Sequence, residues 1–442
     1  MFRPTTLRGA SDTSAEPRLA CRLTRIGMPV KLSDEEAAIA NGDHGELLAE
    51  VLREQVQVGE FFGAERFVPI TNAHFMGDPE VFGQAGQAYL QRLAAGGLRV
   101  RVPTTRNAQS VDFDYAELFA QSPDLVDSER EVRLILRQLG VSVLNTCIPY
   151  QSVYQPCFGE SVAWGDTGTV AYANSVLGAR TNYESGAAGL AAALTGRTPA
   201  YGFHLDASRR ANVRVRVSAD LRDLADWGAL GAVVGERCRG YWNVPAIEAD
   251  RPPTGDELKH FGASLASFGS MAMYHVVGVT PEAATFETAN GGRHLVDDFE
   301  VSQHDIEEMF SRDLREGGPV DLVVFTAPQL SFFEMKRIAE ALEGRSVADS
   351  VRLIITTNGM QCKALEEEGH LAAIRDAGGI VLQGTCWYVM DPAAQRKHFG
   401  WRRLVTNSAK LVNIIRAHGY EPALRRFDDC IEAAITGSLS AR

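Results

Sequence analysis

VRLIITTNGMQCKALEEEGHLAAIRDAGGIVLQGTC, residues 351–386, contains two β-branched apolar runs separated by a segment with helical periodicity. The same order extends outward along the chain in both directions. The predicted elements of this region are strands 320–326, 351–357 and 380–389 and helices 331–343, 361–376 and 407–418. Strands that alternate with helices indicate a parallel sheet with right-handed crossovers. We therefore expect a βαβαβα lobe at about residues 318–420.

The rest of the chain shows the same alternation. Apolar β-branched runs predict further strands, and Ser or Thr followed three residues later by Glu predicts helix starts. The predicted strands are 98–102, 141–146 and 271–277, and the predicted helix starts are Ser33–Glu36, Ser128–Glu131, Thr254–Glu257 and Ser331–Glu334. A Gly- and Ala-rich segment predicts a closely packed helix near 186–195. These patterns indicate an α/β protein of several lobes, with mixed or parallel sheets covered by helices.

The composition disfavours several classes of protein. The chain has 442 residues, 45% of them hydrophobic, and a formal net charge of -12 at pH 7. A nucleic-acid binder needs a basic face, so we expect no nucleic-acid partner. Seven cysteines without paired spacing indicate a reducing compartment, the cytoplasm, rather than a disulfide framework. No apolar run approaches the length of a membrane span, so we expect no membrane partner.

Residues 1–28 differ from the remainder of the chain. They carry five Arg together with Ser and Thr, and they show little periodicity. Such a composition fits a transit peptide, a disordered tail or an overlong start. We favour a disordered tail or an overlong start, with the ordered chain beginning near Met28.

Three cysteines occupy positions where predicted strands end. Cys147 and Cys386 close such runs, and Cys362 follows one after a short Gly-Met-Gln turn. The carboxyl ends of parallel strands form the ligand-binding crevice of α/β sheets, so thiols there suggest a soft-metal or iron–sulfur site. The alternative is that each cysteine is a small buried hydrophobe. Three cysteines in equivalent positions shift the balance toward function.

The densest polar block runs from residue 145 to residue 210. It contains Ala173-Asn-Ser-Val-Leu-Gly-Ala-Arg-Thr-Asn182, few of whose residues suit a core. Arg180 is suited to a bidentate carboxylate clamp. The alternative is a Gly-rich turn whose Asn and Ser satisfy backbone groups, and the block itself leaves both readings open. The candidate ligand-binding residues of the block are Asn174, Ser175, Arg180, Thr181, Asn182 and Glu184.

Two histidines and one lysine are further candidates. His74 and His275 lie at the ends of apolar runs and fit a general acid, a general base or a metal ligand, although a histidine in such a position is often structural. Asn407-Ser-Ala-Lys410 opens a helix, and a helix start with a lysine makes an anion site. The alternative is an ordinary N-cap by Asn407 or Ser408. The sequence contains no Walker A loop, dinucleotide fingerprint or His-Glu-x-x-His.

Together these residues resemble the aconitase X family, the compact relatives of aconitase, from Lys31 to His418. The matching phrases are KLSDEE (31–36), AHFMG (73–77), VPTTRN (102–107), TCIPY (146–150), ANSVLGARTN (173–182), GFHLD (202–206), HVVGVTPEA (275–283), GTC (384–386) and TNSAK (406–410). The resemblance implies an aconitase-like fold with several α/β lobes around a central cleft. It assigns residues 29–442 to the catalytic large-subunit region.

The resemblance also implies a hydro-lyase. Bacterial members resemble cis-3-hydroxy-L-proline dehydratase, which gives Δ1-pyrroline-2-carboxylate, and archaeal members include a mevalonate 5-phosphate dehydratase. The Ala- and Arg-rich sequence favours the hydroxyproline reading. A third reading is a non-catalytic, iron-responsive relative. The intact phrases at 146–150, 173–182 and 406–410 argue against it, and the net charge argues against RNA binding in particular.

In this family the active site holds iron on cysteine ligands, either as a [2Fe-2S] or [4Fe-4S] cluster or as a single ion. The resemblance places these ligands on Cys147 and Cys386, with Cys362 as the third. Iron with an open coordination site acts as a Lewis acid on a substrate oxygen. The remaining assigned roles are catalytic for Lys410, Ser408 and His74 and substrate-binding for Asn174, Ser175, Arg180, Thr181, Asn182, Tyr150 and His275.

The family's complete enzyme also has a small swivelling domain. A serine in its Gly- and Ser-rich loop resembles the base of aconitase, and no such loop occurs in this sequence. The resemblance therefore implies a partner, a small subunit on a second polypeptide. Its serine would act as the base when the two subunits close over the small hydroxy acid.

Overall fold

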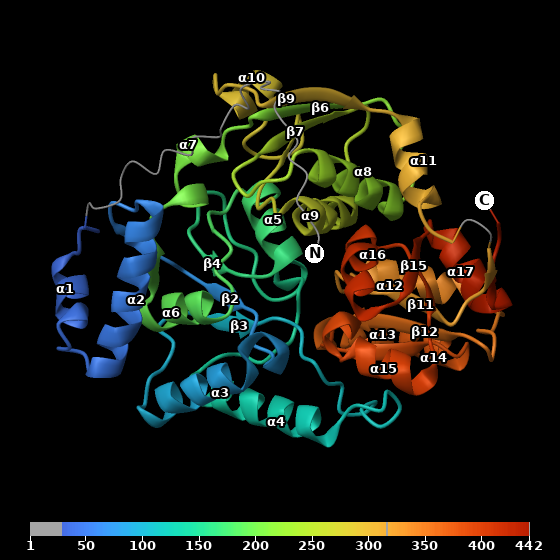
Figure 1. Cartoon of the computed structure of the whole chain (residues 1–442), viewed down its shortest axis with the longest axis horizontal. Helices are drawn as coiled ribbons and strands as arrows, with labels where there is room; N and C mark the ends of the chain where they lie inside the picture. Colours follow the sequence, from blue (N-terminus) through green and yellow to red (C-terminus); the bar gives the residue numbers. More distant parts are fainter. Residues whose placement is uncertain (1–28, 315–316, 442) are drawn as a thin grey trace, which may run out of the picture.

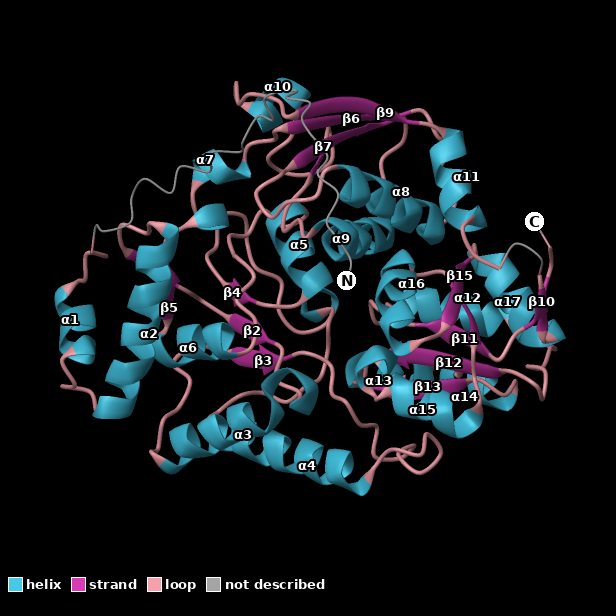
Figure 2. Ribbon diagram, viewed as in Figure 1, coloured by secondary structure: helices cyan, strands magenta, loops and turns pink. Residues whose placement is uncertain are grey.

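Three α/β lobes pack around a common centre (Figures 1 and 2). The structure is a computed structural model that describes residues 29–314 and 317–441, so the expected tail or overlong start at 1–28 lies outside the described residues. The architecture confirms the predicted fold class, with several parallel sheets covered by helices. In the part of the chain that is described, none of the helices has the length and apolarity needed to cross a membrane.

The first lobe contains a small parallel sheet and a short antiparallel ribbon. Its strands are β1 (Phe67–Pro69), β2 (Ala73–Phe75), β3 (Thr104–Arg106), β4 (Ala163–Trp164) and β5 (Arg197–Pro199). Its helices are α1 (Asp34–Ala40), α2 (Glu46–Phe62), α3 (Pro79–Ala95), α4 (Pro123–Gln138), α5 (Thr167–Ser175) and α6 (Ala187–Thr195), with a 3-10 turn η1 (Pro149–Gln151). The parallel sheet has the order β3-β2-β4, and β1 pairs with β5. Helix α6 confirms the helix expected near 186–195.

The sequence of α4 shows why this lobe folds as it does. Val132, Ile135 and Leu136 are buried and share a cluster with Leu90 and Leu93 of α3. Residues three and four apart lie on one face of a helix, so this spacing gives α4 a single apolar stripe. The stripe packs on α3, and both helices cover the lower side of the lobe in Figure 1.

The second lobe is a four-stranded parallel sheet with helices packed closely against it. Its strands are β6 (Val213–Val217), β7 (Pro245–Ala249), β8 (His275–Val276) and β9 (Asp297–Val301), in the order β8-β7-β6-β9. Its helices are α7 (Asp206–Arg209), α8 (Leu224–Arg237), α9 (Gly255–Gly269), α10 (Phe286–Asn290) and α11 (Gln303–Ser311), with a 3-10 turn η2 (Gly202–His204). A Cβ at Gly231 of α8 would lie 2.4 Å from the carbonyl oxygen of Phe261. Glycine at this position therefore allows α8 and α9 to approach each other.

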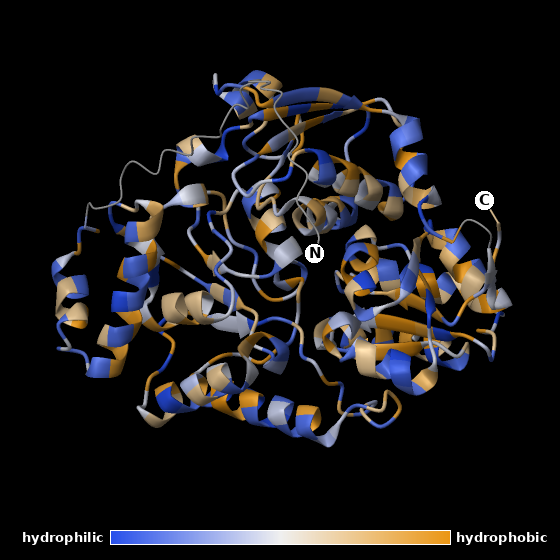
Figure 3. Cartoon of the chain, viewed as in Figure 1, coloured by the Kyte–Doolittle hydropathy of each residue, from blue (hydrophilic) through white to orange (hydrophobic). Residues whose placement is uncertain are grey.

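The third lobe contains the largest sheet. Its strands are β10 (Gly318–Pro319), β11 (Leu322–Phe325), β12 (Arg352–Thr357), β13 (Ile380–Gln383), β14 (Arg403–Thr406), β15 (Glu421–Leu424) and β16 (Ser438–Leu439). Its helices are α12 (Phe332–Ala341), α13 (Gly359–Glu367), α14 (His370–Asp376), α15 (Pro392–Phe399), α16 (Ala409–Ile415) and α17 (Phe427–Thr436), with 3-10 turns η3 (Trp387–Val389) and η4 (Arg416–His418). Five strands form a parallel sheet, β13-β12-β11-β14-β15, and β10 pairs with β16. Figure 3 shows the strands of this sheet as hydrophobic ribbons enclosed by helices, as expected when both faces are buried.

Three of the four predicted helix starts are confirmed. Ser33, Thr254 and Ser331 each form a capping box with the glutamate three residues on, at the start of α1, α9 and α12. The start predicted at Ser128 is wrong, because α4 begins earlier. Its N-cap is Ser122, and Pro123 occupies the first turn, where the fixed φ of proline suits a helix.

Several predicted elements differ from the structure. The runs 98–102 and 141–146 form no strand, and only a single bridge joins Ser142 to Thr105. Cys147 therefore follows a loop rather than closing a strand. The helix predicted over 361–376 is divided into α13 and α14 at Gly369, whose φ of +77° ends a right-handed helix. The sheet of the third lobe, predicted with three strands, also contains the two short strands β14 and β15.

The carboxyl ends of the first and third sheets meet at the centre of the molecule. Gln109, just after β3, forms a parallel bridge with Thr385, just after β13, and its backbone N–H donates to the Gly384 carbonyl over 2.9 Å. Gly384 has a φ of +71°, which favours glycine at this turn. Residues that follow the strands of both sheets are thereby brought into one region, as is usual for ligand sites in α/β folds.

Candidate active site

Cys147 and Cys386 reach the centre from different lobes. Burial raises the pKa of the Cys147 thiol to about 12, the nearby groups Asp166 and Cys386 act in the same direction, and the Lys410 ammonium opposes them. Burial also raises the pKa of Cys386, against the effect of Lys410. The structure thus brings two of the three predicted cysteines together, beside one carboxylate and one ammonium.

Lys410 is the cation of this group. It lies in the first turn of α16, directly after β14. Burial lowers the pKa of its ammonium, but the Asp166 carboxylate, followed by the Cys147 and Cys386 side chains, raises that pKa above its ordinary value. Lys410 therefore stays charged at neutral pH and stabilises negative charge at the centre of the site.

Asp166 is a site residue that the sequence prediction missed. Its Oδ1 accepts a hydrogen bond from Asn107 Nδ2 over 3.2 Å, and its Oδ2 lies 2.9 Å from the Thr169 hydroxyl. The same hydroxyl donates to the Cys147 carbonyl over 2.7 Å, so Asp166 and Cys147 share a partner. The signal in the sequence was Gly165-Asp166 directly after an apolar run. A Cβ at Gly165 would lie 2.5 Å from the Glu184 carbonyl oxygen, so this turn requires glycine.

His74 is the middle residue of β2, and one of its ring nitrogens has a partner. Its Nδ1 is 2.8 Å from the Thr105 hydroxyl, and its ring stands edge-on to Trp164. Burial lowers the pKa of His74 to about 4, although the Asp166 carboxylate acts in the opposite direction. The imidazole is therefore neutral at pH 7 and keeps Nε2 available to a ligand.

Four buried polar atoms around the two cysteines, including His74 Nε2, lack a hydrogen-bond partner among the described residues. They are His74 Nε2, Asn107 Oδ1, Asn145 Oδ1 and Thr385 Oγ1. Each belongs to a side chain that is at least nine-tenths buried. Leaving such an atom unpaired costs about 1–3 kcal/mol, so a cluster of them marks a place where a ligand supplies the missing contacts.

Cys362 lies apart from this group. It belongs to the apolar cluster of the third lobe, with Leu353, Ile355 and Leu365. Burial raises the pKa of its thiol to about 11, and Arg375 acts against burial. Cys362 lies inside α13 rather than at the end of a strand. Cys362 and Cys386 therefore occupy similar positions in the sequence pattern but not in the folded structure.

Ser408 and Tyr150 lie next to the site but have structural partners. The Ser408 hydroxyl caps α16 by accepting from the Leu411 N–H over 3.1 Å and donates to the Ala327 carbonyl over 2.6 Å. The Tyr150 ring stacks on Tyr172 with a centroid distance of 4.0 Å. Burial raises the pKa of Tyr150 well above its ordinary value, so it stays a neutral phenol.

The polar side chains of residues 173–182 form hydrogen bonds with neighbouring segments of the chain rather than facing the cysteines. Asn174 Nδ2 donates to the Thr181 carbonyl over 2.9 Å, and the Thr181 hydroxyl accepts from the Trp164 N–H over 2.9 Å. The Ser175 hydroxyl accepts from the Tyr274 N–H over 2.9 Å. Asn182 Oδ1 accepts from the backbone N–H of Phe203 over 3.1 Å. These side chains satisfy backbone groups, which was the alternative reading of the block.

Arg180 and His275 are engaged away from the cysteine pair. Arg180 donates to the His204 carbonyl over 2.9 Å and forms an ion pair with Asp206. His275, on β8, donates from Nε2 to the Arg209 carbonyl over 2.8 Å. Neither side chain is among the groups that shift the pKa of Cys147, Cys386 or Lys410.

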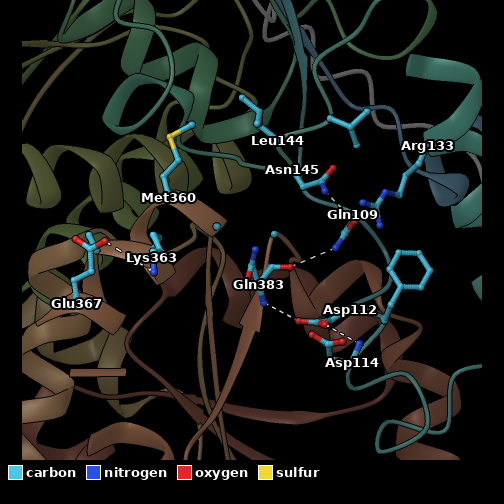
Figure 4. A pocket seen from close by; sticks show the side chains of 15 residues that line it. Gln109, Asp112, Asp114, Arg133, Leu144, Asn145, Met360, Lys363, Glu367 and Gln383 are labelled. Carbon is cyan, nitrogen blue, oxygen red and sulfur yellow. Dashed lines mark hydrogen bonds and ion pairs between the residues drawn. The ribbon is translucent and has the colours of Figure 1, made fainter. Parts of the chain in front are cut away.

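A cavity of about 820 Å³ lies between the first and third lobes (Figure 4). Asn145 and Gly384, each two residues from a cysteine in the sequence, are among its lining residues. Asn145 Nδ2 donates to Gln109 Oε1 over 2.9 Å, and Gln109 Nε2 donates to the Gln383 carbonyl over 3.3 Å. The cavity is therefore bordered by the segments that precede both cysteines, and neither sulfur is among its lining residues.

Residues 29–314 and 317–441 contain no group of three His, Cys, Asp or Glu side chains arranged as a preformed metal site. Cys147 and Cys386 nevertheless provide two sulfur donors, the type that iron–sulfur groups prefer. The unpartnered polar atoms beside them provide hydrogen-bonding capacity around such a group. The donor set fits an iron group carried by these two cysteines.

The comparison with protein families covers nearly the whole described chain. Three models, described as the aconitase X first, second and third domains, match residues 29–207, 211–311 and 320–436. The phosphomevalonate dehydratase large subunit of Thermococcus kodakarensis is 32% identical over 405 residues, which cover 91% of this chain and 99% of that protein. The same subunit of Methanothermobacter thermautotrophicus is 35% identical over 389 residues, covering 87% of this chain and 94% of that protein.

A second group of relatives has a different name. The cis-3-hydroxy-L-proline dehydratase of Pseudomonas aeruginosa is 34% identical over 419 residues, which cover 93% of this chain and 71% of that protein. Among solved structures, the holo-form of Thermococcus kodakaraensis aconitase X superposes with a TM-score of 0.82 at 31% identity, covering 92% of this chain and 100% of that chain. These relatives are dehydratases, which confirms the expected enzyme class over the non-catalytic alternative. The chain thus belongs to the aconitase X family and is a carbon–oxygen lyase.

Proposed function

We propose that this protein dehydrates cis-3-hydroxy-L-proline to Δ1-pyrroline-2-carboxylate. The observation that carries the proposal is the placement of Lys410 and Asp166 beside Cys147 and Cys386. The substrate is a zwitterion with a carboxylate and a ring ammonium. Lys410 suits the carboxylate and Asp166 suits the ammonium, so the two side chains match both charges.

Cys147 and Cys386 are the residues proposed to hold an iron–sulfur cluster or a single iron ion. Their sulfurs come from two lobes, and unpartnered polar atoms surround them. When bound, the iron supplies a Lewis acid that weakens the bond between the substrate's β-carbon and its hydroxyl group. Cys362 is left out of this ligand set because its thiol is enclosed by aliphatic side chains.

The reaction breaks the Cα–H and Cβ–O bonds and forms a C=C bond from the C–H electron pair. The Cα proton passes to a base, the hydroxyl group leaves with a proton as water, and the enamine tautomerises to the ring imine. Lys410 stabilises the negative charge that grows on the carboxylate as the Cα–H bond breaks. His74, neutral at pH 7, offers Nε2 as a hydrogen-bonding group without adding charge.

The base is proposed to be a serine on a small swivelling subunit. Two comparisons support such a partner. The Thermococcus relative is named a large subunit, and the Pseudomonas dehydratase has additional sequence, since this chain covers 71% of it. Closure of the partner over the site would exclude water and complete the set of catalytic groups.

A phosphorylated hydroxy acid such as mevalonate 5-phosphate is the second candidate substrate. The relatives named phosphomevalonate dehydratase large subunit match over 93–99% of their own length, which favours it. The charges of the site oppose it. A phosphate adds negative charge near Asp166, and Arg180 is already paired with Asp206.

The test is an assay of both substrates with the anaerobically iron-loaded chain, alone and together with its small subunit. We expect pyrroline carboxylate to form only when both subunits are present. Turnover of mevalonate 5-phosphate without turnover of cis-3-hydroxy-L-proline would overturn the substrate proposal. Full activity in a chain that contains no iron would overturn the role of the two cysteines.

A further inference from the structure

Gln329 is a fully buried glutamine at the point where the three lobes meet. It lies in the turn between β11 and α12 of the third lobe. Its side chain and backbone reach Asn145 and Cys147 of the first lobe, Thr385 of the third and Lys259 of the second. None of the sequence patterns pointed to this residue, because a single glutamine between a strand and a helix carries no periodic signal.

The contacts of Gln329 use all of its polar groups. Oε1 accepts from the Cys147 N–H over 3.2 Å, and Nε2 donates to the carbonyls of Thr385 over 3.0 Å and Asn145 over 3.3 Å. Its backbone N–H donates to Cys147 Sγ over 3.2 Å, and its carbonyl accepts from Lys259 Nζ over 3.4 Å. One residue therefore fixes the backbone on both sides of the gap between the two cysteines.

The geometry points to Gln329 as the positioning residue that sets the placement of Cys147 relative to Cys386. This inference rests on the proposed function only for the identity of the group that the two sulfurs hold. Thr385 directly precedes Cys386, so a single amide spans the two cysteine segments with one acceptor and two donors. Partners that orient metal ligands commonly alter metal affinity by 10- to 100-fold when they are changed.

The link to Lys259 gives this placement a rigid support. Lys259 is buried on α9 and forms an ion pair with Glu334 of α12. His260 Nε2 lies 2.8 Å from the second oxygen of the same carboxylate. The turn that carries Gln329 is thereby fastened to both neighbouring helices, so its amide keeps one orientation.

Gln329→Glu is the most informative variant. The carboxylate keeps the shape of the side chain and still accepts from the Cys147 N–H, but it has no donor for the carbonyls of Asn145 and Thr385. Gln329→Met keeps the volume and removes every side-chain hydrogen bond. Gln55→Glu is the matched control, since Gln55 is a buried glutamine of α2 that donates to the Arg197 carbonyl over 2.9 Å, away from the cysteines.

The first measurement is iron titration of the apo chain, with the visible spectrum of the loaded chain recorded. We expect both Gln329 variants to bind iron 10- to 100-fold more weakly and to shift the sulfur-to-iron absorption bands, with Gln55→Glu like the wild type. Unchanged affinity and unchanged bands in both Gln329 variants would overturn the inference.

The second measurement needs no iron. Iodoacetamide alkylation of the folded apo chain, read by peptide mass spectrometry, should be at least several-fold faster at Cys147 and Cys386 in the Gln329 variants. Cys238, buried in the second lobe, is the internal reference and should not change. An equal rise at Cys238 would show general loss of packing and would overturn a local role. If the wild type binds no iron, the proposed function fails while this measurement still decides the role of Gln329.

Discussion

The backbone N–H of Gln329 donates to the sulfur of Cys147 over 3.2 Å, so a residue of the third lobe holds a thiol of the first. The second cysteine, Cys386, belongs to the third lobe itself. The relative placement of the two sulfurs is thus a property of the packing between lobes. Substitutions of the cysteines can be distinguished from substitutions that alter the packing between lobes, because the two kinds of substitution affect different side chains.

Replacing the site cysteines should remove iron, whereas replacing Cys362 should not. We expect Cys147→Ser and Cys386→Ser to lower the iron content per chain at least 10-fold, because a neutral hydroxyl is a poor substitute for a thiolate ligand. Cys362→Ser should retain iron, since its side chain lies among Leu353, Ile355 and Leu365. Elemental analysis after anaerobic loading measures this. Loss of iron from Cys362→Ser alone would show that Cys362 is a ligand after all.

Lys410→Met should reduce catalysis with little effect on folding. The variant removes the ammonium that stabilises developing charge, and we expect kcat/KM to fall about 100-fold, equivalent to about 2.7 kcal/mol of transition-state stabilisation. Lys336→Met is the control, because Lys336 is a partly exposed side chain paired with Glu340 on α12. Steady-state kinetics with the small subunit present provide the comparison. Equal losses in the two variants would contradict a specific role for Lys410.

His74 should make the protein less stable as the pH falls from about 6.5 to about 4. Burial lowers its folded-state pKa to about 4 from an ordinary 6.5, so the unfolded chain binds the proton first. Protonation then favours unfolding, and the free energy of unfolding should drop by up to about 3 kcal/mol across this range. Urea unfolding of wild type and His74→Gln at several pH values measures the slope. The variant should lose that part of the slope, and identical slopes would count against the prediction.

Glu334→Gln should destabilise the protein strongly. It removes the carboxylate that faces the buried ammonium of Lys259, and leaving such a charge uncompensated costs about 3–5 kcal/mol. Glu340→Gln, on the exposed side of the same helix, should change stability by less than about 0.5 kcal/mol. Urea midpoints of the two variants give the comparison. A similar small effect in both would mean that the Lys259 ammonium finds sufficient compensation in Asp256, 3.2 Å away.

The third lobe shows both the reach and the limit of periodicity. The runs at 320–326 and 351–357 are continuous and apolar, so β11 and β12 were predictable. β14 and β15 have four residues each, and β15 contains Pro422, which an edge strand tolerates but which interrupts a strand pattern. β14 lies inside the sheet and β15 at its edge, and each pairs with a neighbouring strand that only the folded sheet supplies.

The polar residues of the site were harder to predict than its cysteines. Asn174 and Thr181 were assigned to the substrate, yet their side chains bond to each other's segments and to Trp164. Asp166 lay in the same block and passed unnoticed, although its carboxylate faces the site. An amide or hydroxyl side chain suits a backbone partner and a ligand equally well, so only the folded geometry separates the two roles.

The sequence by itself determined the fold class, most helix starts and the family, because periodicity, caps and phrases such as ANSVLGARTN are local properties of the chain. It also singled out Cys147, Cys386, His74 and Lys410, whose residue types suit the chemistry. The tertiary structure alone decided that Cys362 stands apart, that Asp166 joins the site and that Gln329 spans both cysteine segments. These are relations between residues far apart in the chain, such as Gln329 and Asn145, which are 184 positions apart, and lobe packing, not local sequence, sets them.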